Sequence, residues 1–213
     1  MSVSQKLIDS YQDLFNKATK HKLTEELCAG TLEDKKLFIY LAQDLQFFQS
    51  GLRLTCKLTS LAPTEHSLIT LAKKIGFFAN DENNYFQECL ELLSPSLGKE
   101  EQLRYKETRL PLVDKYIKLI EKLARDESSY AKLVTFTYCM ELVYLQWPKN
   151  FNIPSNLHWK YKTWVDLHAG EHFETWCDFL KGEVDKCNYE EVAPVFAEVL
   201  KSEYEFFDSC YKN

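Results

Sequence analysis

Apolar residues recur every three or four positions along almost the whole chain, and this spacing constrains the fold more than any other feature. In residues 4–18, for example, one stripe is formed by Leu7, Ile8, Tyr11 and Leu14. The 213 residues include only 6 glycines and 6 prolines, too few for the many turns of an all-β fold. The sequence therefore predicts an all-α antiparallel helical bundle that forms one domain over residues 1–213.

Interruptions in the pattern predict where the helices begin and end. Thr31-Leu-Glu-Asp34 resembles a capping box, Thr64 is a candidate N-cap, Asn80-Asp81 separates two segments, and Pro148 is expected to end a helix. The predicted helices span residues 4–18, 31–61, 64–78, 82–93, 111–124, 128–147, 156–181 and 189–211, and residues 99–107 are expected to form a short polar helix or an ordered turn. The stretch at 134–138 has β propensity, but the length of its segment favours a helix.

Charge and hydropathy exclude several classes of partner. The net charge of −6 argues against a basic surface for nucleic acid or for anionic membranes. No apolar run approaches the roughly 18 residues of a membrane span, and Met1–Asp13 lacks the apolar core of a signal peptide. The expected location is the cytoplasm, with the nucleus as a second possibility.

Metal and thiol chemistry find little support in the sequence. The seven cysteines include no C-x-x-C pair and are expected to be reduced core thiols. His168 and His172 have an i, i+4 spacing, but Glu171 is misplaced for H-E-x-x-H and no Glu-x-x-His occurs. We therefore expect no metal and no cofactor. His168 is better explained as part of a pocket wall, and Cys139 as a core thiol rather than a nucleophile.

Three carboxylates stand among apolar and aromatic helix positions. Asp44 shares a helix face with Tyr40, Phe47 and Phe48. Burial among aromatic rings would raise the pKa of such an acid toward the range that suits proton transfer. Flat rings would also suit a flat heteroaromatic ligand.

The other two acids show the same pattern. Glu141 lies between Tyr138 and Tyr144 on one face, and Glu203 faces Phe206 and Phe207. The alternative for each acid is an ordinary place at a helix end or on the surface. Asp44 and Glu141 are the stronger candidates, because their helices are nearly uncharged nearby.

Four segments, in order, resemble the TenA family, also called the thiaminase II family. The first runs from His21 through Gly30-Thr31-Leu32 to Gln43-Asp44, and the second is Glu141-Leu-Val-Tyr144. The others are His168-Ala-Gly-Glu-His-Phe173 and Glu203-Tyr-Glu-Phe206-Phe207. The resemblance covers nearly the whole chain and implies a haem-oxygenase-like helical fold. It is strongest to the eukaryotic branch in which a glutamate replaces the catalytic cysteine.

The resemblance implies chemistry on the 4-amino-2-methylpyrimidine half of damaged thiamin. Asp44 would bind the ring amino group and a ring nitrogen, as a carboxylate can pair with two adjacent donors. Glu203 would move protons at the reacting methylene substituent, and Glu141 would activate water or protonate the leaving amine. The substrate would be walled by Phe47 and Tyr144, with Tyr40, Tyr138 and His168 as further candidates. A homodimer or homotetramer is also implied.

The sequence departs from the family pattern at several positions. With Tyr144 as the anchor, the family's cysteine position falls on Met140 and not on Cys139. His168 stands where a tyrosine or tryptophan is usual, Phe47 replaces a common tyrosine, and no counterpart of the family's tyrosine is identified near residues 105–116. These departures favour the glutamate branch and a remodelled pocket.

The expected activity is hydrolysis of amino- or formylamino-methyl pyrimidines to hydroxymethyl pyrimidine. The alternative is a TenA-like protein without catalysis that binds a ligand or regulates a partner. Haem or di-iron oxygenase chemistry on the related fold is disfavoured by the missing Glu-x-x-His.

Overall fold

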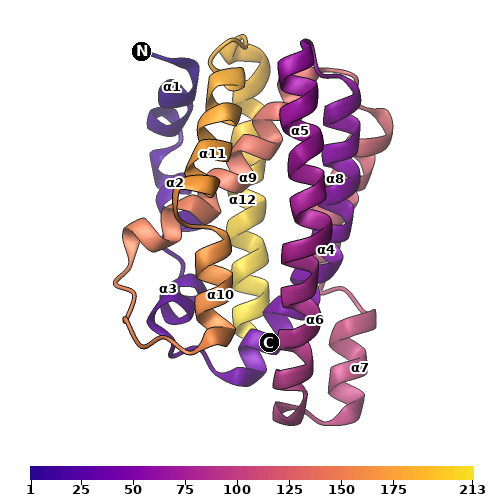
Figure 1. Ribbon diagram of the computed structural model, residues 1–213, viewed down its shortest axis with the longest axis vertical. Coiled ribbons are helices and arrows are strands. Elements are labelled where there is room, and N and C mark those ends of the chain that lie inside the picture. Colours follow the sequence, from indigo (N-terminus) through magenta and orange to yellow (C-terminus); the bar gives the residue numbers. More distant parts are fainter. The chain divides into compact units, whose positions relative to one another are not determined.

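The computed structural model describes residues 1–213, and it is helical with no β-strand (Figure 1). The helices are α1 Val3–Ser10, α2 Gln12–Thr19, α3 Lys22–Ala29, α4 Asp34–Ser60, α5 Glu65–Phe77, α6 Asn83–Leu93, α7 Lys99–Glu107, α8 Pro111–Asp126, α9 Tyr130–Asn150, α10 Trp159–Leu167, α11 Glu171–Val184 and α12 Tyr189–Lys212. A π-helical segment, η1 Phe78–Glu82, joins α5 to α6, and a short 3-10 turn, η2 Ser94–Ser96, follows α6. The prediction of an all-α protein is confirmed, and no helix is long and apolar enough to cross a bilayer.

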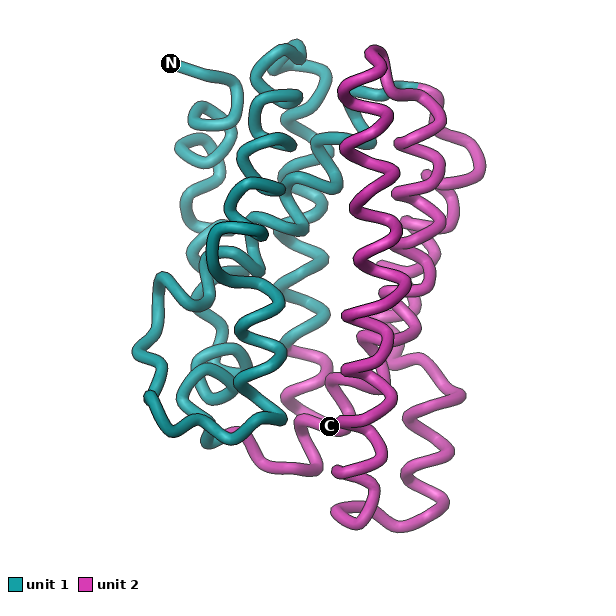
Figure 2. The backbone as a smooth tube through the Cα atoms, viewed as in Figure 1, with its two compact units in different colours: residues 1–31, 129–207 teal, residues 32–128, 208–213 magenta.

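Contacts divide the chain into two compact units (Figure 2). The first unit contains residues 1–31 and 129–207, and the second contains residues 32–128 and 208–213. In the first unit, α9 packs mainly on α11 and also contacts α2 and α3. In the second unit, α4 is central and packs on α5, α6, α7 and α8.

Several helix boundaries agree with the predictions from sequence. The hydroxyl of Thr64 accepts a hydrogen bond from Ser67 N at 3.1 Å and caps α5. Ser129 caps α9 in the same way through Lys132 N, at 3.2 Å. The β-prone stretch at 134–138 is helical, because it lies inside this long capped helix.

The predicted capping box at residues 31–34 is wrong. Gly30 adopts a left-handed conformation with φ 72°, and Thr31 N donates to the carbonyl of Glu26 at 2.8 Å. This is the Schellman pattern that ends a helix. Thr31 therefore terminates α3, and α4 begins after Glu33 with no side-chain cap.

Two predicted long helices are each divided in two. Residues 4–18 are interrupted at Tyr11, whose φ of −122° and ψ of 31° lie outside the helical region. Residues 156–181 are interrupted after His168, where Gly170 has φ 79°. Residues with these dihedral angles cannot continue an α-helix.

Pro148 does not end its helix as predicted, since α9 continues to Asn150. The proline lies in the last turn, where its missing N–H removes only one bond near the helix end. Phe151 N donates to the carbonyl of Trp147 at 3.1 Å and closes the helix beyond the proline.

Asn80-Asp81 does not separate two helices, because residues 78–82 form one π-helical turn. Lys74, Phe78, Glu82 and Phe86 are four residues apart and all buried. Positions four apart drift around an α-helix with 3.6 residues per turn, and a wider π turn compensates for that drift. The π turn thus keeps Glu82 on the buried face.

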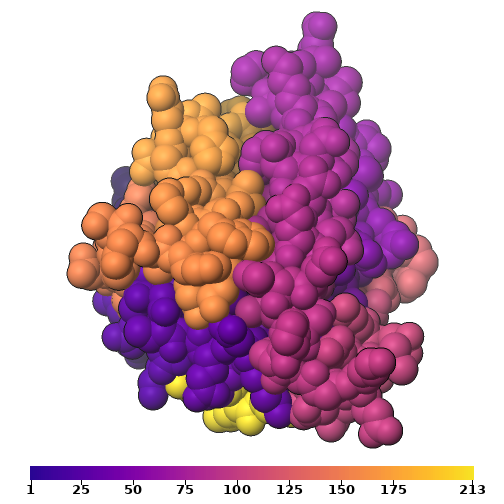
Figure 3. Space-filling model, turned by 60° about the horizontal axis from the view of Figure 1, so that its bottom comes forward, coloured from indigo at the N-terminus to yellow at the C-terminus, as the bar shows by residue number.

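In the first unit, Gly30 lies against Leu157, which precedes α10, and against Tyr161 in α10. The colours of Figure 3 place α10 and the residues before it, in orange, against the indigo residues of α3. A Cβ at Gly30 would lie 2.5 Å from Cδ1 of Leu157, a distance that requires the leucine side chain to shift.

We expect Gly30→Ala to destabilise the protein, because a residue with Cβ in the left-handed region costs about 1–2 kcal/mol before any contact. The midpoint of thermal unfolding should fall by about 2–8 °C, as expected for a chain of this size. Gly182→Ala in α11 is the matched control, since a Cβ there meets nothing within 4 Å. It should leave the midpoint unchanged or raise it. Equal effects of the two variants in thermal denaturation would contradict this explanation.

Candidate functional site

Asp44 is a buried carboxylate in the middle of α4, with 2% of its surface exposed. Tyr40, one turn earlier, is fully buried, and Phe47, one turn later, is 6% exposed. An ionised group in such surroundings is costly unless it is paired or serves a ligand. The structure thus confirms that Asp44 is not an ordinary surface residue.

Aromatic rings surround the helix face next to Asp44. The ring of Phe47 lies 5.0 Å from the ring of Tyr116, and the ring of Phe48 lies 5.4 Å from Phe86 and 6.1 Å from Phe78. These separations are typical of packed aromatic pairs. The second unit therefore presents one carboxylate with flat apolar side chains on the neighbouring turn.

Tyr116 was missed by the sequence reasoning, although it lies at the end of the segment where a tyrosine was sought. It is buried in α8, with 1% exposed surface, and contacts Phe47. The signal that could have revealed it is the buried face of α8, on which it lies with Val113, Ile117 and Ile120.

Gln43 fixes the start of α8 relative to α4. Its side-chain amide donates to the carbonyls of Tyr105 at 2.8 Å and Thr108 at 3.0 Å, and its oxygen accepts from Leu110 N at 2.8 Å. This fully buried glutamine satisfies three backbone groups at the α7–α8 turn, two of them in buried hydrogen bonds. These bonds hold the start of α8 beside Gln43, the residue that directly precedes Asp44.

Glu82 is a second buried carboxylate of the same unit that the sequence did not suggest. It is 4% exposed and lies four residues from both Phe78 and Phe86, the two rings that contact Phe48. In the sequence, only the four-residue spacing of Glu82 from these two rings indicates a buried position. The break expected at Asn80-Asp81 removed that spacing from consideration.

Glu141 and Glu203 belong to the first unit, and both are buried, with 5% and 0% exposed surface. Glu141 lies in α9, on which every residue from Leu133 to Leu145 is buried. Glu203 lies in α12, and after burial its carboxylate is the second cause of the raised pKa of Cys139 in α9. Placement on the open surface is therefore excluded for both acids.

Tyr144 and His168, which the sequence proposed as wall residues, lie in one aromatic cluster. Their rings are 4.9 Å apart, and the ring of Tyr144 is 4.2 Å from Trp147 and 6.1 Å from Phe207. Trp164 packs on His168 edge to face at 4.4 Å. α9, α10, the turn after it and α12 thus each contribute rings to this cluster.

The tautomer of His168 follows from one hydrogen bond. Its Nδ1 lies 2.9 Å from the carbonyl oxygen of Trp164, which can only accept, so Nδ1 carries a proton. In the neutral ring, Nε2 is then the acceptor nitrogen. This bond lies at the C-terminal end of α10 and orients a 5%-exposed imidazole against Tyr144.

Tyr138 lies in a different environment from Tyr144. Its ring is 6.5 Å from Phe196, and its pKa is raised mainly by burial and also by the nearby thiols of Cys139 and Cys177. Its hydroxyl bonds to the side chain of Ser4 in α1. The structure therefore does not bring Tyr138 to the rings around Tyr144.

Cys139 has the properties of a core thiol. It is fully buried, and its Sγ donates to the carbonyl of Phe196 at 3.5 Å. Burial and then the Glu203 carboxylate hold its pKa well above the usual range. Since the thiolate is the reactive form, these surroundings suppress nucleophilic chemistry.

We expect Cys139→Ser to keep most of any hydrolytic activity, within about threefold, because a residue that is not the nucleophile contributes little to the barrier. Steady-state rates and thermal stability of the same preparation would check this. A loss of roughly a thousandfold without unfolding would instead support cysteine catalysis.

The two histidines of residues 168–173 do not lie on one helix, as an i, i+4 metal pair would require. His168 is the buried C-cap of α10, whereas His172 is exposed in the first turn of α11. The helix break at Gly170 separates them. No group of three or more His, Cys, Asp and Glu side chains is placed to hold a metal ion.

The structure thus groups the candidate residues by unit. Asp44, Tyr40 and Phe47 lie in the second unit, and Glu141, Tyr144, His168 and Glu203 lie in the first. All are buried. That the three carboxylates act on one ligand stays a prediction.

Solved structures of similar fold come from archaea and bacteria. A TenA homologue of P. horikoshii matches with a TM-score of 0.81 at 16% identity, covering 100% of this chain and 99% of that one. A TenA-like protein of Sulfolobus solfataricus, proposed to be a thiaminase, matches with a TM-score of 0.75 at 16% identity, covering 98% and 96%. A TenA family transcription regulator of Silicibacter matches with a TM-score of 0.79 at 14% identity, covering 99% and 97%.

At these identities the similarity shows the fold, and the haem-oxygenase-like helical arrangement is confirmed. No curated protein matches the chain. The profile of one protein family matches residues 8–213, which is nearly the entire sequence. The chain therefore belongs to the TENA/THI-4/PQQC family.

Proposed function

We propose that this protein hydrolyses aminomethyl and formylaminomethyl derivatives of 4-amino-2-methylpyrimidine, giving the hydroxymethyl pyrimidine. The observation that carries the proposal is the burial of Asp44, Glu141 and Glu203, at 2%, 5% and 0% exposure. Titratable groups in buried, desolvated places are typical of functional sites, so the burial of these three acids supports a ligand that uses them. Family membership and the similarity to a protein proposed to be a thiaminase support a role connected with thiamin.

Asp44 is proposed to bind the aminopyrimidine ring. A carboxylate can accept two parallel hydrogen bonds from the amino group and the adjacent protonated ring nitrogen. Phe47 and Tyr116, 5.0 Å apart in the second unit, would cover one face of the ring. Tyr40 would support Asp44 from the preceding turn of α4.

Glu141 and Glu203 are proposed to carry the proton transfers. In the hydrolysis of the amine, water replaces the amino group, so R–CH2–NH2 and H2O give R–CH2–OH and NH3. One carboxylate takes a proton from the water, and the other gives a proton to the leaving nitrogen. Tyr144 and His168 would wall the reacting end of the substrate.

The test is incubation of the purified protein with each pyrimidine in water enriched in oxygen-18, followed by mass spectrometry. The proposal predicts labelled hydroxymethyl pyrimidine and one equivalent of ammonia per turnover. Unchanged substrate, or thiamin cleavage faster than amine hydrolysis, would contradict it. The protein is further proposed to act in the cytoplasm as a homodimer or homotetramer, which sedimentation would measure.

A second function is a ligand-binding or regulatory role without catalysis. It is favoured by the similarity to a TenA family transcription regulator and by the departures from the family pattern at Met140, Phe47 and His168. Binding of the pyrimidine without turnover would support it.

A further inference from the structure

We propose that the indole N–H of Trp147 is a hydrogen-bond donor to the carbonyl oxygen of the formylamino substrate, a role that rests on the proposed function. Trp147 is 1% exposed, and its Nε1 is buried with no hydrogen-bond partner. Buried donors are nearly always bonded, and one that is not reduces stability. Such a group is retained when a bound ligand supplies the missing acceptor.

The surroundings of Trp147 favour a ligand over a trapped water. Its ring lies 4.2 Å from Tyr144, 5.4 Å from Phe207 and 6.2 Å from His168. A buried water needs two to four polar partners. The aromatic ring faces around Trp147 provide few polar partners for a water, and Nδ1 of His168 is already bonded to the carbonyl of Trp164.

The chemistry of the two substrates indicates which atom Trp147 serves. The amine end of one substrate donates hydrogen bonds, and the buried carboxylates suit it as acceptors. The formyl oxygen of the other only accepts, so it needs a donor, and an ionised carboxylate cannot be one. Trp147 and Glu141 both belong to α9 in the first unit, so one helix carries a donor and a proton acceptor.

The step that would use this donor is hydrolysis of the formamide. Water oxygen bonds to the formyl carbon, the C–N bond breaks, and a proton passes to nitrogen, so R–CH2–NH–CHO and H2O give R–CH2–NH2 and HCOOH. Negative charge develops on the formyl oxygen in the transition state. A fixed N–H directed at that oxygen stabilises it without reorganisation.

The test compares both substrates in one variant. Trp147→Phe keeps an aromatic ring but removes the N–H. We expect kcat on the formylamino compound to fall by about a hundredfold, the usual effect of losing one donor to a developing oxyanion. The rate on the amine should stay within about threefold. Equal losses on both substrates, or no loss on either, would overturn the proposal.

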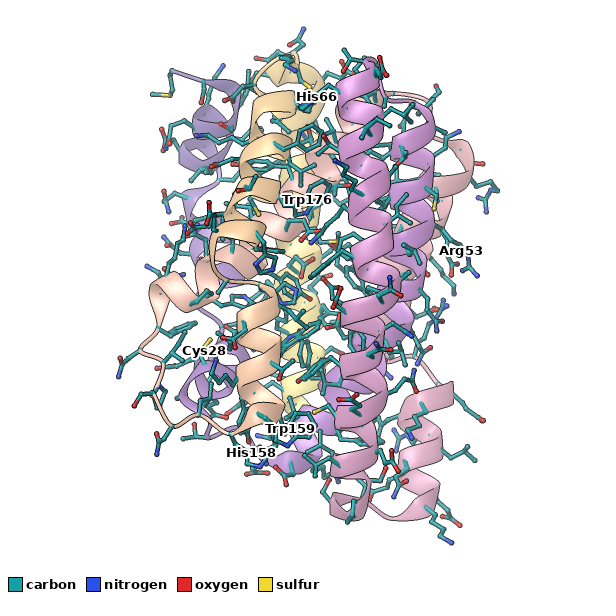
Figure 4. The ribbon with its side chains drawn as sticks, viewed as in Figure 1. Cys28, Arg53, His66, His158, Trp159 and Trp176 are labelled. Atoms are coloured by element: carbon teal, nitrogen blue, oxygen red, sulfur yellow. The ribbon has the colours of Figure 1, made fainter.

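A second replacement guards against misfolding. Benzothienylalanine at position 147 has the two-ring shape of tryptophan with sulfur in place of N–H. It should reproduce the substrate-selective loss while the thermal midpoint stays near that of wild type. The control is Trp159→Phe, since Trp159 is 41% exposed and lies at the start of α10 (Figure 4). That variant should leave both rates unchanged.

A readout without turnover separates this proposal from the proposed function. The chain has four tryptophans, so a nitrogen-15 label on the indole gives few signals, which the variants assign. The Trp147 signal should shift with the formylamino compound and much less with the amine. If wild type hydrolyses neither compound, the proposed function fails. The shift of the Trp147 signal would still show whether the indole N–H contacts the formyl group. An identical response to both compounds, or none, would overturn it.

Discussion

Turnover by Glu203→Gln is expected to fall by about two to four orders of magnitude, the usual scale of general acid–base catalysis. Glutamine preserves the size of a side chain that is 0% exposed, but it cannot take up or release the proton. Because Glu203 is proposed to act as the exocyclic bond breaks, its loss should affect the transition state more than the bound product. Calorimetry should therefore show nearly normal affinity for hydroxymethyl pyrimidine.

Glu205→Gln is the matched control for this variant. Glu205 lies two residues away on α12, has 20% side-chain exposure and is 3.7 Å from Lys201. An ion pair whose lysine is 59% exposed contributes little, so turnover should change by less than about twofold. A similar loss in both variants would indicate damage to α12 and would contradict a role for Glu203 in proton transfer.

Asp44→Asn is expected to fail in a different way. Asparagine keeps the shape but places a donor where the ring amino group needs an acceptor. Binding of both substrate and product should weaken by about 2–3 kcal/mol, the scale of a hydrogen bond to a charged group. That is a loss of about thirty- to 150-fold in Kd.

Calorimetry with hydroxymethyl pyrimidine measures this loss directly, and Asp34→Asn in the exposed first turn of α4 is the control. Unchanged product affinity in Asp44→Asn would remove Asp44 from the binding role. If wild type binds the pyrimidine and neither Asp44→Asn nor Glu203→Gln alters turnover, the binding-module alternative replaces the enzyme.

The helical class could be predicted because apolar periodicity is a local property that each segment carries by itself. The ends of helices were less predictable, since they depend on single backbone angles. Gly30 and Gly170 both adopt positive φ, and each ends or divides a helix that periodicity alone had extended. Thr31 looked like an N-cap because its spacing to Asp34 was suitable, but its N–H was already bonded to Glu26.

Burial of the three carboxylates could be anticipated from their aromatic neighbours at helical offsets. The positions of Tyr116 and Glu82 could not be anticipated in this way, because they depend on contacts between helices distant in sequence. Phe47 meets Tyr116 where α4 packs on α8, and Gln43 bonds to the turn before α8. Glu82 reaches the buried face only through a π turn that an α-helical pattern does not contain.

The central claim is that Asp44 and Glu203 act on one aminopyrimidine. A crystal structure of the protein with bound hydroxymethyl pyrimidine tests it most directly. The account predicts that Asp44 accepts hydrogen bonds from the ring amino group and that Glu203 lies within hydrogen-bond distance of the hydroxymethyl oxygen. A pyrimidine bound elsewhere, or bound to only one of these two acids, would contradict it.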